Sequence, residues 1–245
     1  TIEQICEAIK GNKLAPMVFE GDARSPNGNV IGFSRVRFSA ACASLIRSGY
    51  PVLIVGLLEG EGLHASCAVG FRSSSPTPPQ NGSFVKLQES DIGHVYIHDD
   101  NIGPNVRFEV CEDATNHFVR LKRSAPPPNS GINRLNTGLY PDFIPIRLVV
   151  AVHEDLRTSP DQLHQCGLKK AVNVFSALSG ILKSSGHNPL PLSFSTRFIK
   201  LSEYIGCELE NTLGDNPGLL GKVRLALWEK VPPMSLHIGV VRIGS

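Results

Sequence analysis

Two segments of this 245-residue chain carry the side chains best suited to chemistry. Residues 63–71 have the pattern of a buried strand with His64 near its start, and residues 95–99 have the pattern of a strand that ends in Asp99. A histidine can take a proton from a nucleophile, and an acid beside it can hold the imidazole in one tautomer. His64 and Asp99 therefore predict the base and the orienting acid of a Cys-His-Asp triad.

Each residue alone also has an ordinary structural explanation. A single histidine on a strand is commonly a core or edge residue, and acids before Gly103-Pro104 are common in turns. If the two residues act as a pair, an imidazole nitrogen of His64 should lie about 2.6–3.2 Å from an Asp99 carboxylate oxygen. Asp100 should point the other way, because successive strand residues alternate faces.

The nucleophilic cysteine is the member that these segments do not supply. A reactive thiol is typical of a helix start, whereas Cys6 and Cys42 fall within helical patterns. We therefore expect the nucleophile to lie upstream of Thr1. The six cysteines form no CxxC pair and no disulfide pattern, which favours a reducing, cytoplasmic setting.

The surrounding patterns predict the elements that position these residues. The apolar run 51–58, the turn Glu59-Gly60-Glu61-Gly62 and the strand 63–71 predict an antiparallel hairpin. Ser159, Pro160 and Gln162 predict the start of the longest helix, running to about Lys183. Its expected buried stripe consists of Leu163, Cys166, Val174, Leu178 and Ile181.

The order of elements predicts an α+β fold rather than a wound parallel sheet. Helices are expected at 1–10 and 34–48, before a run of strands. A loop rich in proline and serine at 123–138 marks the expected boundary between a region 1–122 and a C-terminal α/β region 139–245. The role of the second region is open.

The first region resembles a known family. His64-Ala65 followed by Val69-Gly70-Phe71, and then by an apolar strand ending in Asp99, resembles the papain-like cysteine peptidases. With the apolar strand just before the histidine, it looks most like the bacterial double-glycine-leader peptidases. The resemblance implies a papain-like half with an antiparallel sheet and flanking helices, His64 as general base and Asp99 as its orienter. It implies a peptidase or related amide or thioester hydrolase without metal or organic cofactor.

One departure leaves a second function open. Nothing near Cys6 resembles the Gln…Cys-Gly helix start of that family. The alternative to an enzyme is therefore an inactive papain-like scaffold that acts as a protein-interaction module. In either case the expected partner is a peptide or protein, and the oligomeric state is open.

Net charge and the remaining motifs limit the partners and ligand sites that the sequence gives reason to expect. The 24 basic and 22 acidic residues nearly cancel, which gives no argument for nucleic acid or a membrane surface as partner. No apolar run approaches the ~20 residues that span a bilayer. No glycine-rich phosphate loop occurs. Among weaker groupings, His153 and Asp155 are interpreted as a loop, and His164 with Cys166 as a helix pair rather than a metal site.

Overall fold

The computed structural model describes residues 1–24, 28, 31–74, 85–88, 92–113, 117–124, 141–156, 158–213, 216–230 and 237–244. Most of the expected boundary at 123–138 lies outside these ranges. Helical spacing predicts a core position for Trp228, but of this residue only the backbone is described.

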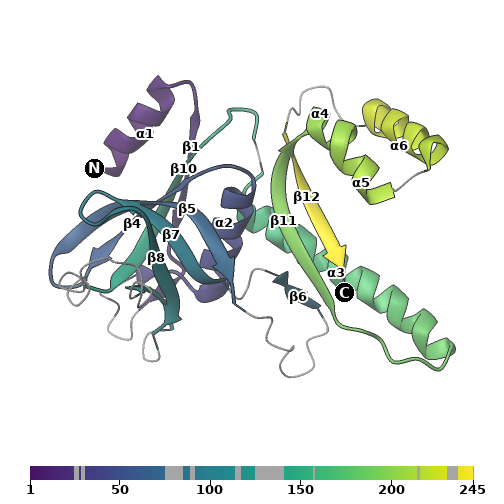
Figure 1. The fold of residues 1–245 in the computed structure, drawn as a ribbon, viewed down its shortest axis with the longest axis horizontal. Coiled ribbons are helices and arrows are strands. Elements are labelled where there is room, and N and C mark those ends of the chain that lie inside the picture. Colours follow the sequence, from purple (N-terminus) through teal and green to yellow (C-terminus); the bar gives the residue numbers. More distant parts are fainter. Residues whose placement is uncertain are drawn as a thin grey trace, which may run out of the picture.

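A seven-stranded antiparallel sheet forms the larger part of the molecule (Figure 1). Its strand order is β1-β10-β4-β5-β7-β8-β9, and β9 also pairs with β10, so the sheet curves strongly. The bounds are β1 Ala15–Glu20, β4 Val52–Leu58, β5 Gly62–Ser73, β7 Ile92–Asp99, β8 Gly103–Glu112, β9 Val119–Arg123 and β10 Phe143–Val152. Beside it lies a short ribbon of β2 (Ala23–Arg24) and β3 (Ile31–Gly32).

The hairpin predicted from the sequence is confirmed. β4 and β5 are adjacent and antiparallel, with Leu58 opposite Gly62 and Gly56 opposite His64. Gly60 and Gly62 both have positive φ, which glycine adopts without steric cost, so this turn sequence favours the reversal. The hairpin sets which face of the sheet His64 occupies.

Two helices cover the large sheet. α1 (Ile2–Gly11) begins with the predicted capping box between Thr1 and Gln4 and lies beside β1. α2 (Arg35–Arg47) is the central core helix, and every residue from Phe38 to Leu45 is buried. Its small residues let the helix pack closely against β4, β5 and β11.

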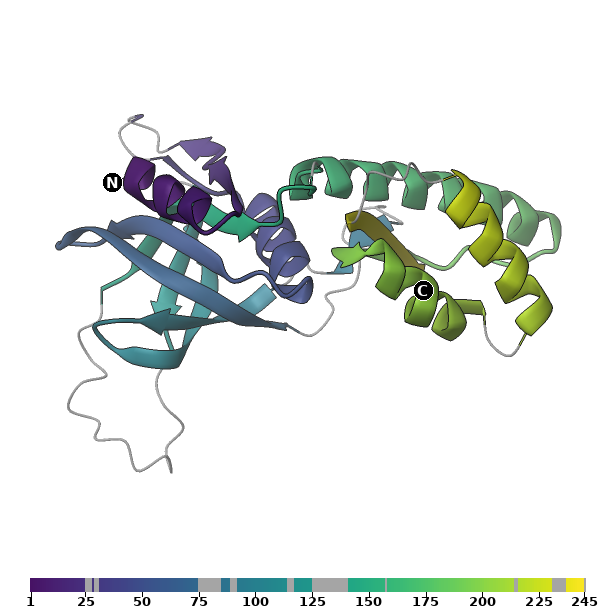
Figure 2. The same ribbon diagram turned by 90° about the horizontal axis from the view of Figure 1, so that it is seen from above.

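A second sheet of three strands lies at the other end of the molecule (Figures 1 and 2). β11 (Leu192–Lys200) pairs antiparallel with β12 (His237–Gly244) and parallel with β6 (Val85–Leu87). The accompanying helices are α3 Pro160–Ser184, α4 Leu201–Glu203, the π-helix η3 Tyr204–Glu208, α5 Leu209–Leu213 and α6 Pro217–Lys230. The mixture of helices with largely antiparallel sheets confirms the α+β class.

The two sheets exchange strands across the expected boundary. β10 follows the boundary in sequence yet lies between β1 and β4 in the large sheet. β6 precedes the boundary yet pairs with β11 in the small sheet. A boundary at 123–138 therefore does not separate the two sheets, because strand pairing depends on hydrogen bonds between segments distant in sequence.

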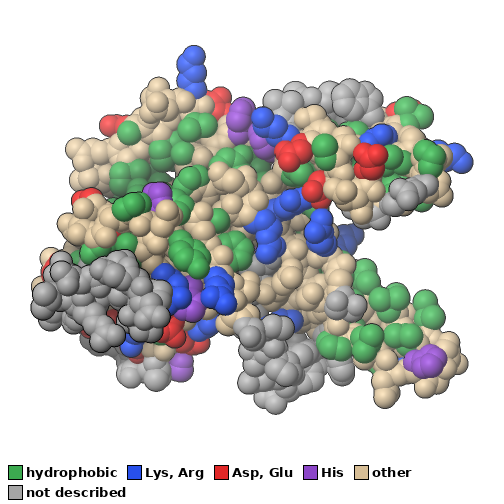
Figure 3. Space-filling model, viewed as in Figure 1, with side chains coloured by type: hydrophobic (Ala, Val, Ile, Leu, Met, Phe, Trp, Pro, Cys, Tyr) green, Lys and Arg blue, Asp and Glu red, His purple; other side chains and the backbone are tan. Residues whose placement is uncertain are grey.

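The longest described helix is α3, as predicted, with Ser159 as N-cap and a capping box to Gln162. Its predicted buried stripe is wrong beyond Leu163. Cys166, Val174, Leu178 and Ile181 are all exposed, and the buried positions are Pro160, Leu163, Gly167 and Ala171. The reason is geometric: the second half of α3 extends past the small sheet and has little to pack against, and its apolar side chains show at its projecting end (Figure 3).

Within the described ranges, no helix is both long and apolar enough to cross a membrane.

Candidate active site at His64 and Asp99

His64 and Asp99 meet as predicted. Nε2 of His64 lies 2.7 Å from Oδ2 of Asp99. β5 and β7 are antiparallel neighbours with Cys67 opposite His98. Continuing that register by one residue places Ser66 opposite Asp99, so His64 reaches the acid diagonally on the same face of the sheet.

At least three donors hold the Asp99 carboxylate. Besides His64, the hydroxyl of Ser66 donates to Oδ2 at 2.6 Å, and the backbone N–H of Asn101 donates to Oδ1 at 2.9 Å. The Asp99 side chain has no solvent exposure. A buried carboxylate held this firmly can orient an imidazole and stabilise its protonated form.

The prediction for Asp100 is wrong. Its Oδ1 lies 3.8 Å from Nε2 of His64, so its carboxylate is turned toward the histidine rather than away from it. β7 ends at Asp99 and residue 100 already belongs to a turn, so the alternation of a strand does not extend to it. Asp100 is 81% exposed and adds a solvated negative charge beside the pair.

The imidazole of His64 is held with one nitrogen uncommitted. Its side chain is 15% exposed and packs edge-on against the ring of Phe143, with centroids 5.9 Å apart. Since Nε2 is bound to Asp99, Nδ1 is the nitrogen left for a substrate or nucleophile. No hydrogen bond from a described residue reaches Nδ1.

A cavity of about 660 Å³ lies beside His64. Val55 and Ile146 give it apolar walls, and Asp100 and Arg147 add charge. Thr1 and the first turn of α1 line its remaining side. A mostly apolar hollow with a few polar groups is typical of sites for small segments of substrate.

The cysteines of the described structure do not supply a nucleophile for this cavity. No cysteine is among the described residues that line it. Burial raises the pKa of the Cys42, Cys67 and Cys111 thiols, whereas a nucleophile needs a lowered one. Cys67 lies on β5 itself, but at odd spacing from His64 and hence on the opposite face. A nucleophile upstream of Thr1 remains a prediction.

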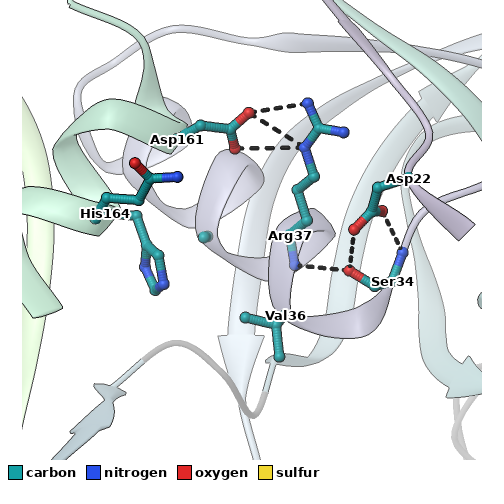
Figure 4. Close-up of a pocket in the computed structure, with 8 residues that line it drawn as sticks. Asp22, Ser34, Val36, Arg37, Asp161 and His164 are labelled. Carbon is teal, nitrogen blue, oxygen red and sulfur yellow. Dashed lines mark hydrogen bonds and ion pairs between the residues drawn. The ribbon is translucent and has the colours of Figure 1, made fainter.

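A second hollow of about 390 Å³ lies between α2 and α3 (Figure 4). Arg37 donates from Nη2 to Asp161 at 2.9 Å, and the hydroxyl of Ser34, the N-cap of α2, donates to Asp22 at 2.7 Å. These charged groups therefore have partners already. Their evident role is to fix the start of α2 and to join it to α3.

One further group of side chains comes together that the sequence patterns did not indicate. His153 and Asp155 do lie in a loop, as predicted, but His237 from β12 joins them. No local pattern could indicate this contact, because it joins two distant segments.

No family model, no curated protein and no solved structure matches this chain.

Proposed function

We propose that this chain carries the base and orienting acid of a papain-like cysteine hydrolase, a peptidase or a related amide or thioester hydrolase. The observation that carries the proposal is the 2.7 Å contact between His64 Nε2 and Asp99, which leaves Nδ1 as the proton-accepting nitrogen. A base next to an acid and an adjoining cavity is the arrangement that nucleophilic catalysis requires.

The proposed reaction uses these groups in order. Nδ1 of His64 takes the proton of a cysteine thiol, and the thiolate attacks the substrate carbonyl carbon. The buried Asp99 carboxylate stabilises the imidazolium that forms. His64 then gives its proton to the departing amine or thiol, and water hydrolyses the acyl-enzyme with His64 again as base.

The nucleophile in this proposal precedes Thr1 in a longer chain. The first turn of α1 lines the cavity beside His64, so residues joined to Thr1 would start at that cavity. This position supports a thiol delivered from the N-terminal side.

The test uses the full-length protein, with whatever residues precede Thr1. We expect iodoacetamide at pH 6, read out by peptide mass spectrometry, to alkylate one cysteine upstream of Thr1 at least about 10-fold faster than the others. His64→Ala should lower that rate about 10- to 100-fold, because the imidazolium partner of the thiolate is lost. The matched control is His98→Ala, which removes an exposed histidine from the adjacent strand.

The second candidate is an inactive papain-like scaffold that binds a protein. The absence of a cysteine among the described residues around the cavity favours it. It predicts no fast-reacting thiol in the same experiment and no effect of His64→Ala on alkylation. That outcome would remove the hydrolase proposal.

A further inference from the structure

A second group of ligand-type side chains lies where the two sheets approach each other. His153 directly follows β10 of the large sheet, Asp155 lies two residues on, and His237 begins β12 of the small sheet. Nδ1 of His153 lies 2.8 Å and Nδ1 of His237 lies 2.9 Å from the same oxygen, Oδ1 of Asp155. The three residues offer ligand atoms that all lie within 4.8 Å of one another.

This convergence matches the donor set of a metal site. Ligand atoms around a tetrahedral zinc ion, at about 2.0–2.1 Å from the metal, lie about 3.3 Å from one another. The spacings around Asp155 Oδ1 need only small adjustments to reach that geometry. Two imidazole nitrogens and one carboxylate oxygen are also the donors that first-row divalent metals prefer.

The loop that carries two of these ligands is held in place. The backbone N–H of Leu156 donates to the carbonyl of His153 at 3.0 Å, and the backbone of His153 is hydrogen-bonded to the hydroxyl of Tyr50. His237 is buried, and its ring lies 5.0 Å from that of His153. The ligands therefore come from positioned backbone rather than from a free surface loop.

The three side chains also have the chemistry that a divalent cation requires. A metal ion bound here would take one oxygen of the Asp155 carboxylate and one nitrogen from each neutral imidazole.

We propose that His153, Asp155 and His237 bind one divalent first-row metal ion, with Zn²⁺ as the reference ion. Three protein ligands leave a fourth position for water. Since β10 and β12 belong to different sheets, the ion would tie the large sheet to the small one. The site is separate from His64 and does not depend on the proposed hydrolase function.

The test is zinc binding by the purified 245-residue chain after removal of metal with EDTA. Calorimetric titration with ZnCl₂ should show one ion per chain, and saturating zinc should raise the melting temperature by about 5–10 °C. Co²⁺ in place of zinc should give visible absorption without thiolate charge transfer, because no cysteine is a ligand. No binding, or a thiolate band, would overturn the proposal and leave a plain His-Asp-His hydrogen-bond network.

Variants locate the ion. His153→Gln is the decisive change, because its side chain is 55% exposed and its loss leaves no core cavity. His153→Gln and Asp155→Asn should each lose the binding and the melting shift. His187→Gln, at an exposed histidine after α3, and His64→Gln, in the other His-Asp cluster, should keep both. Binding that survives His153→Gln or disappears in His64→Gln would place the ion elsewhere and contradict the assignment.

Discussion

At the scale of single residues, Asp99 and Asp100 are neighbours in sequence with opposite surroundings. Asp99 is buried and accepts from His64, Ser66 and the Asn101 backbone, whereas Asp100 is mostly exposed and lies 3.8 Å from His64. Two acids within reach of one histidine provide an internal comparison. Only the first is positioned to fix the tautomer of the imidazole.

If the chain has the proposed thiol-dependent hydrolase activity, we expect Asp99→Asn to lower its kcat by about 10²–10⁴-fold. An amide can present its N–H₂ to Nε2 and so favour the wrong tautomer of His64. Asp100→Asn should have a much smaller effect, below about 5-fold, since solvent screens its charge. Steady-state kinetics on the full-length protein measure both. Equal losses in the two variants would show that Asp99 acts only through its charge.

The contact between His64 and Asp99 could be predicted because each residue lies within a clear strand pattern. Alternation along 63–69 predicts that His64 and Ser66 lie on one face of the sheet, and in the structure they do. The orientation of Asp100 could not be predicted by alternation, because β7 ends one residue earlier. The end of a strand depends on partner strands, which the local sequence does not contain.

At the scale of elements, the strand that carries His64 depends on close packing of its hairpin partner. Gly56 lies opposite His64 in β4, and a methyl group there would lie 2.3 Å from the carbonyl oxygen of Ile144 in β10. Backbone cannot move aside as a flexible side chain can. A glycine is thus required where β4 passes β10.

Gly56→Ala should lower the free energy of unfolding by about 2–4 kcal/mol, because β4 and β10 must separate to admit the methyl group. The matched control is Gly180→Ala on the exposed face of α3, where nothing lies within 4 Å. That change should raise the free energy of unfolding by about 0.5–1 kcal/mol through helix propensity. Urea denaturation measures both, and a neutral Gly56→Ala would refute the packing argument.

For α3, local sequence patterns predict where the helix begins but not which of its residues are buried. Ser159, Pro160 and Gln162 start the helix through bonds within a few residues, so its N-terminus could be predicted. Burial of Val174, Leu178 and Ile181 could not, because it requires a neighbouring element that the second half of α3 lacks. Apolar periodicity predicts which face could be buried, but tertiary structure decides whether it is.

At the scale of the whole molecule, the two sheets are joined by strands, by side chains and by α2. β6 and β10 cross between the predicted regions, Arg37 on α2 pairs with Asp161 on α3, and α2 contacts β11. Such long-range links have no local sequence signal. The α+β class could be predicted from the order of elements, whereas the exchange of strands could not.

Beside the small sheet, Glu208 at the end of η3 should make stability depend on pH. Hydrogen bonding from Arg197 on β11, with further charge from Arg242 on β12, lowers the pKa of this carboxyl despite partial burial. A lowered folded-state pKa means that the stabilisation is complete above the unfolded value of about 4.3. It is then lost as pH falls through the folded pKa.

We expect the free energy of unfolding to fall between about pH 5 and pH 3, and Glu208→Gln to reduce this slope. At pH 7 the same variant should cost about 1 kcal/mol, the scale of a partly exposed ion-pair network. Urea titrations across this range measure the effect, with Glu154→Gln, at an exposed loop acid, as control. Identical slopes for Glu208→Gln and the wild-type chain would contradict the role of this carboxylate.

The most direct test of the central claim, that Asp99 holds His64 as a base with Nδ1 available, is the tautomer of His64. ¹⁵N-detected NMR of the imidazole in the 245-residue chain, at a pH where His64 is neutral, distinguishes the two forms. The structure predicts a proton on Nε2, donated to Asp99, and an unprotonated Nδ1. Asp99→Asn should abolish that preference. A proton on Nδ1 in the wild-type chain would leave that nitrogen unable to accept a proton from a thiol and would contradict the proposed function.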